Sequence, residues 1–330
     1  MIHRKKSRIK LLMNMQRCNQ KNIKSQQGVV IVVALFFVAL IAMMSYYMMN
    51  RLARDTLRTQ LLLRNVKAEL YAQGSIYWAL EQLKTDVEKQ KPNLPVDKIP
   101  LQSPIDEMQG YKIYSVITDA QSRFNLNTLT NTDAQVDFKK LLRLLAPDLN
   151  DKNAQDIVLA AIDWITPGQQ QNELNKYYMS LPLPYRAAHR PMVSASELQL
   201  VKGMTPALYR LLENYITALP SSSAFVNVQT ATAPVLAALS PNMTIATAKA
   251  IEAKRSQVNI SSVDAFLAMD LLKNHPIKKE KIVVLSHYFL IETIVEIEKQ
   301  HIFLYTLVER SGDQGKSTVR IVWQSKGISA

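Results

Sequence analysis

The sequence predicts an α+β fold: a long N-terminal helix packed on a small antiparallel sheet, with a large all-α domain inserted between the strands. Three observations predict it. An apolar run at 29–49 continues into a helical pattern that meets no proline before Pro92. Strand-like alternation occurs at 111–118 and again near the C-terminus. The region between these strands, about 120–283, is rich in helix-start signals.

The segment 1–28 is strongly basic. It holds eight Lys or Arg and no acid, a charge of +8, so the rest of the +13 chain carries 13 − 8 = +5. The 21 apolar residues that follow, 29–49, span about 31 Å as a helix, which matches the hydrocarbon core of a bilayer. This arrangement predicts a cytoplasmic N-terminus and an exported bulk. A cleaved secretory signal fits poorly, because the run is long and no small-x-small site follows; a plain uncleaved anchor stays an alternative.

The helical pattern continues past the membrane run. Apolar residues recur at spacings of mostly three to five, at Leu52, Leu57, Leu61, Leu62, Val66, Leu70, Ile76, Leu80 and Leu83. We therefore expect one helix of about 60 residues, with a membrane half at 29–49 and an amphipathic half at 50–90 that packs on the sheet. A coiled-coil stalk is the alternative for the second half.

The sheet is expected from two separated parts of the chain, 105–119 and 284–326. A proline-broken loop, 91–104, precedes the first part. The strand-like segments are 111–118, 286–300, 301–311 and 317–325. They alternate apolar and polar residues, so one face of the sheet should pack on the helix and the other should face solvent.

The insertion, 120–283, contains a weak internal echo. NLNT at 125–128 and NVQT at 227–230 each open a helical stretch, with the threonine as the expected N-cap. SASEL at 194–198 and SSVDAF at 261–266 resemble capping boxes that start a later helix. These signals predict two related helical units.

The two units are expected at about 120–218 and 224–280. The first copy spaces its two signals 69 residues apart and the second 34, because a polar loop around 163–190 enlarges the first. Within the first unit, LVKGMTPALYRLL at 200–212 is similar to a helix-hairpin-helix turn, where Gly203 permits a positive φ. Such turns can bind DNA phosphates. The region lacks a dense Lys/Arg stripe, so a hairpin that packs against protein is favoured.

The N-terminus resembles that of type IV pilins and type II secretion pseudopilins, on the basic leader, the glycine and the apolar helix in KSQQGVVIVVALFF. The resemblance implies cleavage by a prepilin peptidase between Gly28 and Val29, and N-methylation of Val29. Major members have Glu at the fifth mature position, whereas this chain has Val33. A subunit without that carboxylate cannot pair with the amine of a subunit ahead of it, which suits the first subunit at a tip.

Further segments resemble the K-type minor pseudopilins of type II secretion. They are DAQSRFNLNTL (119–129), AAIDWI (160–165), YYMSLPLPYRAAHRPMVSASELQLVKGM (177–204) and FVNVQTATAPVLAAL (225–239). The resemblance implies a pilin-like fold with an inserted SAM-like, helix-hairpin-helix domain, and a minor pseudopilin that initiates or caps the pseudopilus tip for protein export across the outer membrane.

The same resemblance implies partners and a place in the cell. The partners would be the I-type and J-type minor pseudopilins, the major pseudopilin, the prepilin peptidase and the inner-membrane secretion platform, with no nucleic acid. The chain would cross the inner membrane of a Gram-negative bacterium once, with its C-terminal bulk in the periplasm. The alternative function is a membrane-anchored periplasmic helix-hairpin-helix protein that binds DNA.

Relatives in this family often carry an acid-rich calcium loop after the Asp-Trp-Ile motif. In this chain the loop has only two acids, Asp163 and Glu173, while Asn172 and Asn175 could lend oxygens. Calcium prefers six to eight oxygen ligands, several of them carboxylate. We predict weak or absent calcium binding and no other cofactor.

Nothing in the sequence indicates an enzyme. The five histidines show no HExxH or similar ligand spacing, and there is no GxSxG or P-loop. The single cysteine, Cys18, lies in the leader, so a cleaved chain would have no disulfide and no thiolate metal site. A structural or binding role is expected.

Overall fold

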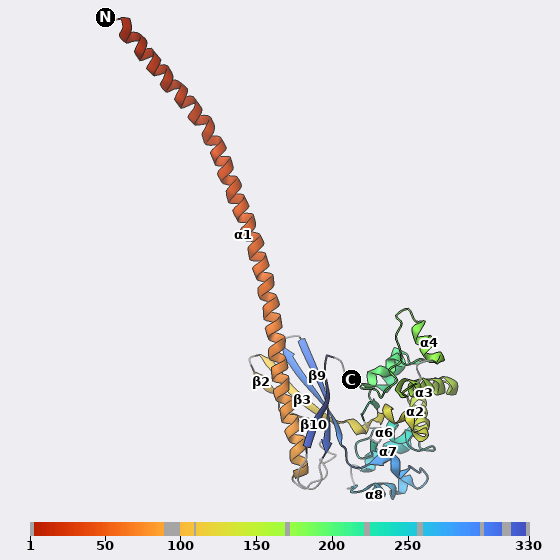
Figure 1. Ribbon diagram of the computed structural model, residues 1–330. Coiled ribbons are helices and arrows are strands. Elements are labelled where there is room, and N and C mark those ends of the chain that lie inside the picture. Colours follow the sequence, from red (N-terminus) through yellow and green to blue (C-terminus); the bar gives the residue numbers. More distant parts are fainter. Residues whose placement is uncertain are drawn as a thin grey trace. The chain divides into compact units, whose positions relative to one another are not determined.

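The computed structural model has its long N-terminal helix followed by a sheet and a helical domain (Figure 1). It describes residues 3–88, 100–108, 110–168, 172–220, 225–255, 260–297, 300–311 and 318–327. The chain divides into two compact units, with the boundary between Lys67 and Ala68. The α+β fold class is confirmed.

The N-terminal helix α1 runs without interruption from His3 to Glu88 (Figure 1). The predicted helix began at Val29, so the structure extends it back through the leader. The leader contains no proline, and its only glycine is Gly28, while Lys, Arg, Gln and Met are good helix formers. Within α1, the stretch Gly28–Lys84 is long and apolar enough to cross a membrane, with a mean hydropathy of 2.8 in its most apolar window.

The face of α1 that packs on the sheet combines alanines with larger aliphatic residues. Its fully or nearly fully buried residues are Ala68, Ala72, Ile76, Ala79, Leu80 and Leu83. The predicted packing face was only partly right, because Leu70 is 65% exposed between the buried Ala68 and Ala72. Alanine at this face lets the helix axis approach the sheet closely, because its side chain is a single methyl group.

The sheet has the strand order β1-β3-β8-β9-β10, and all of these pairings are antiparallel. The strands are β1 (Leu101–Gln102), β3 (Tyr111–Asp119), β8 (Tyr288–Ile297), β9 (Gln300–Ser311) and β10 (Thr318–Lys326), with β2 (Asp106–Met108) paired to β3. The predicted loop 91–104 contains β1, while its residues 91–99 lie outside the described residues. The whole helical domain is inserted between the neighbouring strands β3 and β8.

The first helical unit contains η2 (Ala120–Ser122), β4 (Phe124–Asn125), η3 (Leu126–Thr130), α2 (Thr132–Leu145), α3 (Asp151–Ile165), α4 (Glu173–Met179), η4 (Ala195–Leu200), α5 (Pro206–Leu212) and β5 (Ile216–Thr217). The second contains β6 (Val226–Asn227), α6 (Ala233–Ala238), α7 (Ile245–Arg255), α8 (Val263–Leu267), η5 (Asp270–Leu272), η6 (Lys279–Lys281) and β7 (Ile282–Val283). Each unit has its own apolar core, the first around Phe138 and Trp164 and the second around Phe266.

The two units repeat one closing device. In each, a two-residue strand pairs in parallel with a strand at the unit's far end, β4 with β5 and β6 with β7. Asn125 and Asn227 end the first strands, and the side-chain oxygen of each accepts a backbone N–H two residues on. The asparagine therefore caps each turn. The predicted cap by threonine was wrong, because the backbone N–H at the start of the turn donates to the asparagine side-chain oxygen.

Two further local predictions concern a helix start and a turn. Ser194 and Glu197 form a reciprocal capping box at the start of η4, as predicted. Gly203, between η4 and α5, has φ of +88°, and a Cβ there would lie 2.9 Å from Ile157 on α3. The hairpin turn therefore presses directly on α3, which only glycine permits.

Candidate functional site

The predicted cleavage junction lies inside α1. Gly28 and Val29 are both exposed, and a Cβ at Gly28 would meet nothing within 4 Å. Val33, at the fifth position after the junction, is exposed in the same apolar stretch. The part of α1 that follows the junction thus presents exposed apolar side chains, suited to lipid or to other apolar helices. Cleavage and methylation at this site stay predictions.

The predicted calcium loop connects α3 and α4 and is held by amide and imidazole groups. Asp163 lies near the end of α3, where its Oδ1 accepts a hydrogen bond from Asn172, while Oδ2 has no hydrogen-bond partner within the described part of the chain. His189, at φ +46°, bonds through one ring nitrogen to Asn175 and through the other to the Asp163 carbonyl. Burial raises the pKa of Asp163, opposed by the Asn172 hydrogen bond and by His189.

Glu173, the other predicted acid of this loop, begins α4 and faces solvent. Its carboxylate forms an ion pair with Lys176 at 2.6 Å, and that lysine lowers the pKa of Glu173. Over the described ranges, which omit 169–171 of this loop, no group of three or more His, Cys, Asp or Glu could hold a metal ion. The described oxygens fit a calcium ion poorly, since only the Asp163 carboxylate is both buried and short of partners.

A buried carboxylate joins the sheet to the helical domain. Asp119, the last residue of β3, is 2% exposed. Its oxygens accept hydrogen bonds from the Gln121 backbone N–H at 2.8 Å, Asn227 Nδ2 at 3.0 Å, Ser286 Oγ at 2.6 Å and the Thr230 hydroxyl. Burial raises the pKa of Asp119, and the four hydrogen bonds oppose that shift. One side chain therefore ties β3 both to the second helical unit and to the segment that returns to β8.

Gln121 and Arg310 secure the same junction. The Gln121 amide donates to the Phe225 carbonyl at 2.8 Å and accepts from the His287 backbone N–H at 2.6 Å. The Arg310 guanidinium donates to the Ser286 carbonyl at 3.0 Å and lies over the Phe289 ring. Both crossings between sheet and insertion are thus fixed by side chains. The sequence does not reveal this site, because an Asp at a strand end gives no signal of which residues it will contact.

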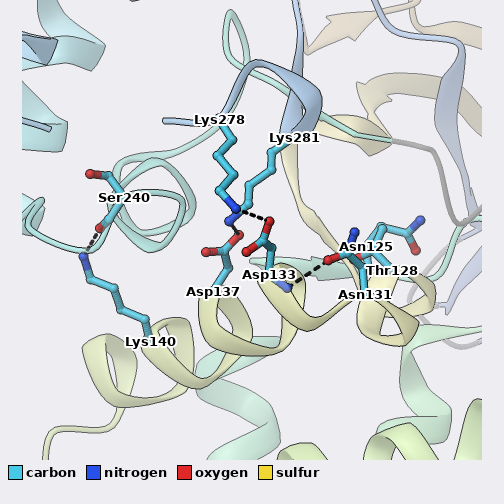
Figure 2. A network of polar contacts seen from close by, with 9 residues as sticks. All are labelled: Asn125, Thr128, Asn131, Asp133, Asp137, Lys140, Ser240, Lys278 and Lys281. Carbon is cyan, nitrogen blue, oxygen red and sulfur yellow. Dashed lines mark hydrogen bonds and ion pairs between the residues drawn. The ribbon is translucent and has the colours of Figure 1, made fainter. Parts of the chain in front are cut away.

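A polar network on α2 connects the two helical units (Figure 2). Asp133, Asp137 and Lys140 recur along one face of α2 in the first unit. Lys278 and Lys281 of the second unit reach toward α2 and pair with Asp133 and Asp137, each at 2.6 Å.

Lys140 extends the same network beyond the ion pairs. Its ammonium donates to the carbonyls of Ser240, Pro241 and Met243, the last two at 3.1 and 2.8 Å. Burial lowers the pKa of Lys140 and raises the pKa of Asp137, which the Lys281 hydrogen bond opposes. The first helical unit therefore contacts the second helical unit through three charged side chains on α2.

Replacing Asp137 by alanine is expected to destabilise the protein by roughly 2–3 kcal/mol, because the largely buried Lys281 would lose its partner. Asp133→Ala is the matched control: its pair with Lys278 has the same 2.6 Å length but lies at the surface, where an ion pair contributes little. Chemical denaturation monitored by tryptophan fluorescence measures both. Equal losses of stability in the two variants would contradict the role given to burial.

Fold and sites together define a class of protein. It is a membrane-anchored subunit with one long N-terminal helix, which contains the apolar span and whose C-terminal part packs on a small antiparallel sheet, as in pilins. Comparison with known proteins identifies the family. Models of Type II secretion system (T2SS), protein K match residues 122–221 and 226–285. The chain belongs to the type II secretion system protein K family and is a minor pseudopilin of type II secretion.

Individual relatives agree with this assignment. A type II secretion system protein K of Klebsiella pneumoniae is 30% identical over 267 residues, which cover 75% of this chain and 81% of that protein. The protein of Pectobacterium carotovorum is 28% identical over 316 residues, 88% of this chain and 94% of the relative. A chain of the GspK-GspI-GspJ complex from enterotoxigenic Escherichia coli matches the fold with a TM-score of 0.70 at 24% identity, covering 82% of this chain and all of that one. None of these matches supports the DNA-binding alternative.

Proposed function

We propose that this minor pseudopilin occupies the tip of the pseudopilus and initiates or caps its assembly. The observation that carries the proposal is the helical insertion between β3 and β8, two units with separate cores. A domain of that size has no room inside a tightly packed helical filament, but it can project from an end. Val33, in place of the usual glutamate, supports the same position, because this subunit needs no neighbour ahead of it.

The partners we propose are the I-type and J-type minor pseudopilins, which are present with the solved chain in the Escherichia coli complex. The major pseudopilin, the prepilin peptidase and the inner-membrane platform complete the set. The helical domain would lie in the periplasm of a Gram-negative cell and the leader in the cytoplasm, in line with the charge excess before the apolar run. The role is structural rather than enzymatic.

Tip position can be tested by imaging. A small epitope placed at Lys152, an exposed residue at the start of α3, would be labelled with gold on pseudopili assembled from an excess of major pseudopilin. We expect one label at one end of each filament. Labels distributed along the filament would contradict the proposal, and filaments of normal number and length in cells lacking this chain would contradict initiation.

We further propose that this chain binds calcium weakly or not at all. The Asn172 amide already occupies one Asp163 oxygen, and Glu173 faces Lys176 instead of the loop. We expect the melting temperature of the full chain in detergent to differ by less than about 2 °C between millimolar calcium and excess chelator, since binding far below saturation adds little stability. A rise of several degrees with calcium, lost in Asp163→Asn, would overturn this prediction.

A further inference from the structure

The first helical unit carries an open groove that neither the fold nor the assembly role explains. Its volume is about 930 Å³, and it lies between α3, α5 and the start of α4. The floor is formed by the buried residues Ile157, Ala160 and Leu208. The hairpin turn at Gly203 also lines it, close against Ile157. The groove is therefore a formed feature of the packed domain.

Large apolar side chains stand at the rim of this groove, although the rest of the exposed face of α3 is polar. Leu159 on α3 is 52% exposed and Leu211 on α5 is 49% exposed, and both line the groove. The other exposed residues of α3 include Lys152, Asn153 and Asp156. Leucine exposed on each wall of one concavity is the arrangement expected of a binding surface.

The walls determine what form of partner fits. α3 and α5 are helices, so their backbone groups are paired within each helix, and no open strand edge lines the groove. A partner therefore cannot be bound by strand addition and must be recognised through its side chains. An amphipathic helix meets this requirement, since its apolar residues at i and i+4 lie on one face and can enter a groove between two helices.

The charges at the rim determine the sign of the partner. Asp148 and Asp156 both line the groove and are exposed, and neither forms an ion pair with any residue that the structure describes. The lysine at the rim, Lys202, lies over the Tyr177 ring, 4.6 Å from its centre. That ammonium keeps its charge, but the two carboxylates outnumber it, so the net charge of the rim is negative, which favours a cationic partner. We propose that this groove binds an amphipathic helix of a partner protein, with two leucine-like residues four apart and a Lys or Arg beside them.

The test uses two synthetic helical peptides with the same leucine stripe, one flanked by lysines and the other by glutamates. Binding of each labelled peptide to the full chain in detergent is measured by fluorescence anisotropy. The double variant Leu159→Ser with Leu211→Ser should weaken binding of the lysine peptide at least about tenfold. Val136→Ser is the control, because Val136 is an even more exposed apolar residue (64%) on α2 outside the groove. Micelles contribute equally to all samples.

A charge exchange completes the test. The double variant Asp148→Lys with Asp156→Lys should reverse the preference, so that the glutamate peptide binds more tightly than the lysine peptide. The four altered groove residues are exposed, so the variants should fold, and the melting temperature of each variant checks this. The proposal is overturned if the lysine peptide fails to bind at millimolar concentration, if the leucine double variant and Val136→Ser bind it equally, or if charge exchange leaves the preference unchanged.

Discussion

Replacing Gly28 by leucine is expected to leave the chain uncleaved and to abolish type II secretion in cells that depend on it. The resemblance to pseudopilins implies a peptidase that requires glycine before the cut. The substitution should not disturb the fold, because a Cβ at Gly28 would meet nothing within 4 Å and leucine favours a helix. A loss of secretion in this variant would therefore result from failed cleavage and not from misfolding.

Intact-mass spectrometry of the membrane-extracted chain measures the effect. The unaltered protein should begin at Val29, with or without an N-terminal methyl group. The Gly28→Leu variant should keep its leader and begin at Met1 or Ile2. Gly74→Ala is the control, because Gly74 is a second α1 glycine with open space around it. An unaltered chain that begins at Met1 in peptidase-competent cells would show that the junction is not a cleavage site.

The second large effect is expected at the junction between sheet and insertion. Replacing Asp119 by alanine removes the acceptor of four hydrogen bonds at a site that is 2% exposed. The donors of Asn227 and Ser286 would stay buried without it, and each unsatisfied buried group costs about 1–3 kcal/mol. We expect a loss of at least roughly 3 kcal/mol of unfolding free energy, or two separate transitions as the helical domain melts independently of the sheet.

Calorimetry of the full chain distinguishes these outcomes, and Asp119→Asn, which keeps the volume and one acceptor, should lose less stability.

The contribution of Asp119 to stability should depend on pH in a defined direction. Because burial raises the folded-state pKa of Asp119, its contribution is fully present below the unfolded pKa of about 3.9 and decreases as pH rises through the folded pKa. The difference between the unaltered protein and Asp119→Ala should therefore be larger at acidic than at neutral pH. A difference that grows with pH would contradict the assignment.

Much of the architecture could be predicted because it depends on local pattern. A long apolar run after basic residues predicts a membrane helix whatever follows it, and alternation predicted β3 and the three C-terminal strands. The capping box at Ser194 was visible for the same reason, since its partner Glu197 is three residues away. The start of α1 was mistaken because a functional boundary at Gly28 is not a boundary of helix propensity.

The sites were harder to predict. Asp163 and Glu173 are ten residues apart in the chain, yet one is buried against Asn172 and the other faces solvent beside Lys176. Both were expected in one polar loop around 163–190, whereas Asp163 lies in α3 and Glu173 begins α4. The loop's composition could not tell which way each carboxylate would face. Leu70 was likewise expected on the packing face of α1, but Ala68 and Ala72 are buried there and Leu70 is exposed. A spacing of three to five residues does not determine which of two adjoining faces packs on the sheet.

The sequence by itself determined the order of elements, the membrane anchor, the two-part helical insertion and the family. Only the tertiary structure decided how the parts are joined. Asp119 meets Asn227 and Ser286 across 108 and 167 residues of chain, and Lys281 meets Asp137 across 144. Such contacts form when β3 and β8 become neighbours and close the insertion between them. Their energy depends on burial and on partners brought together by that path, which no local pattern of residues records.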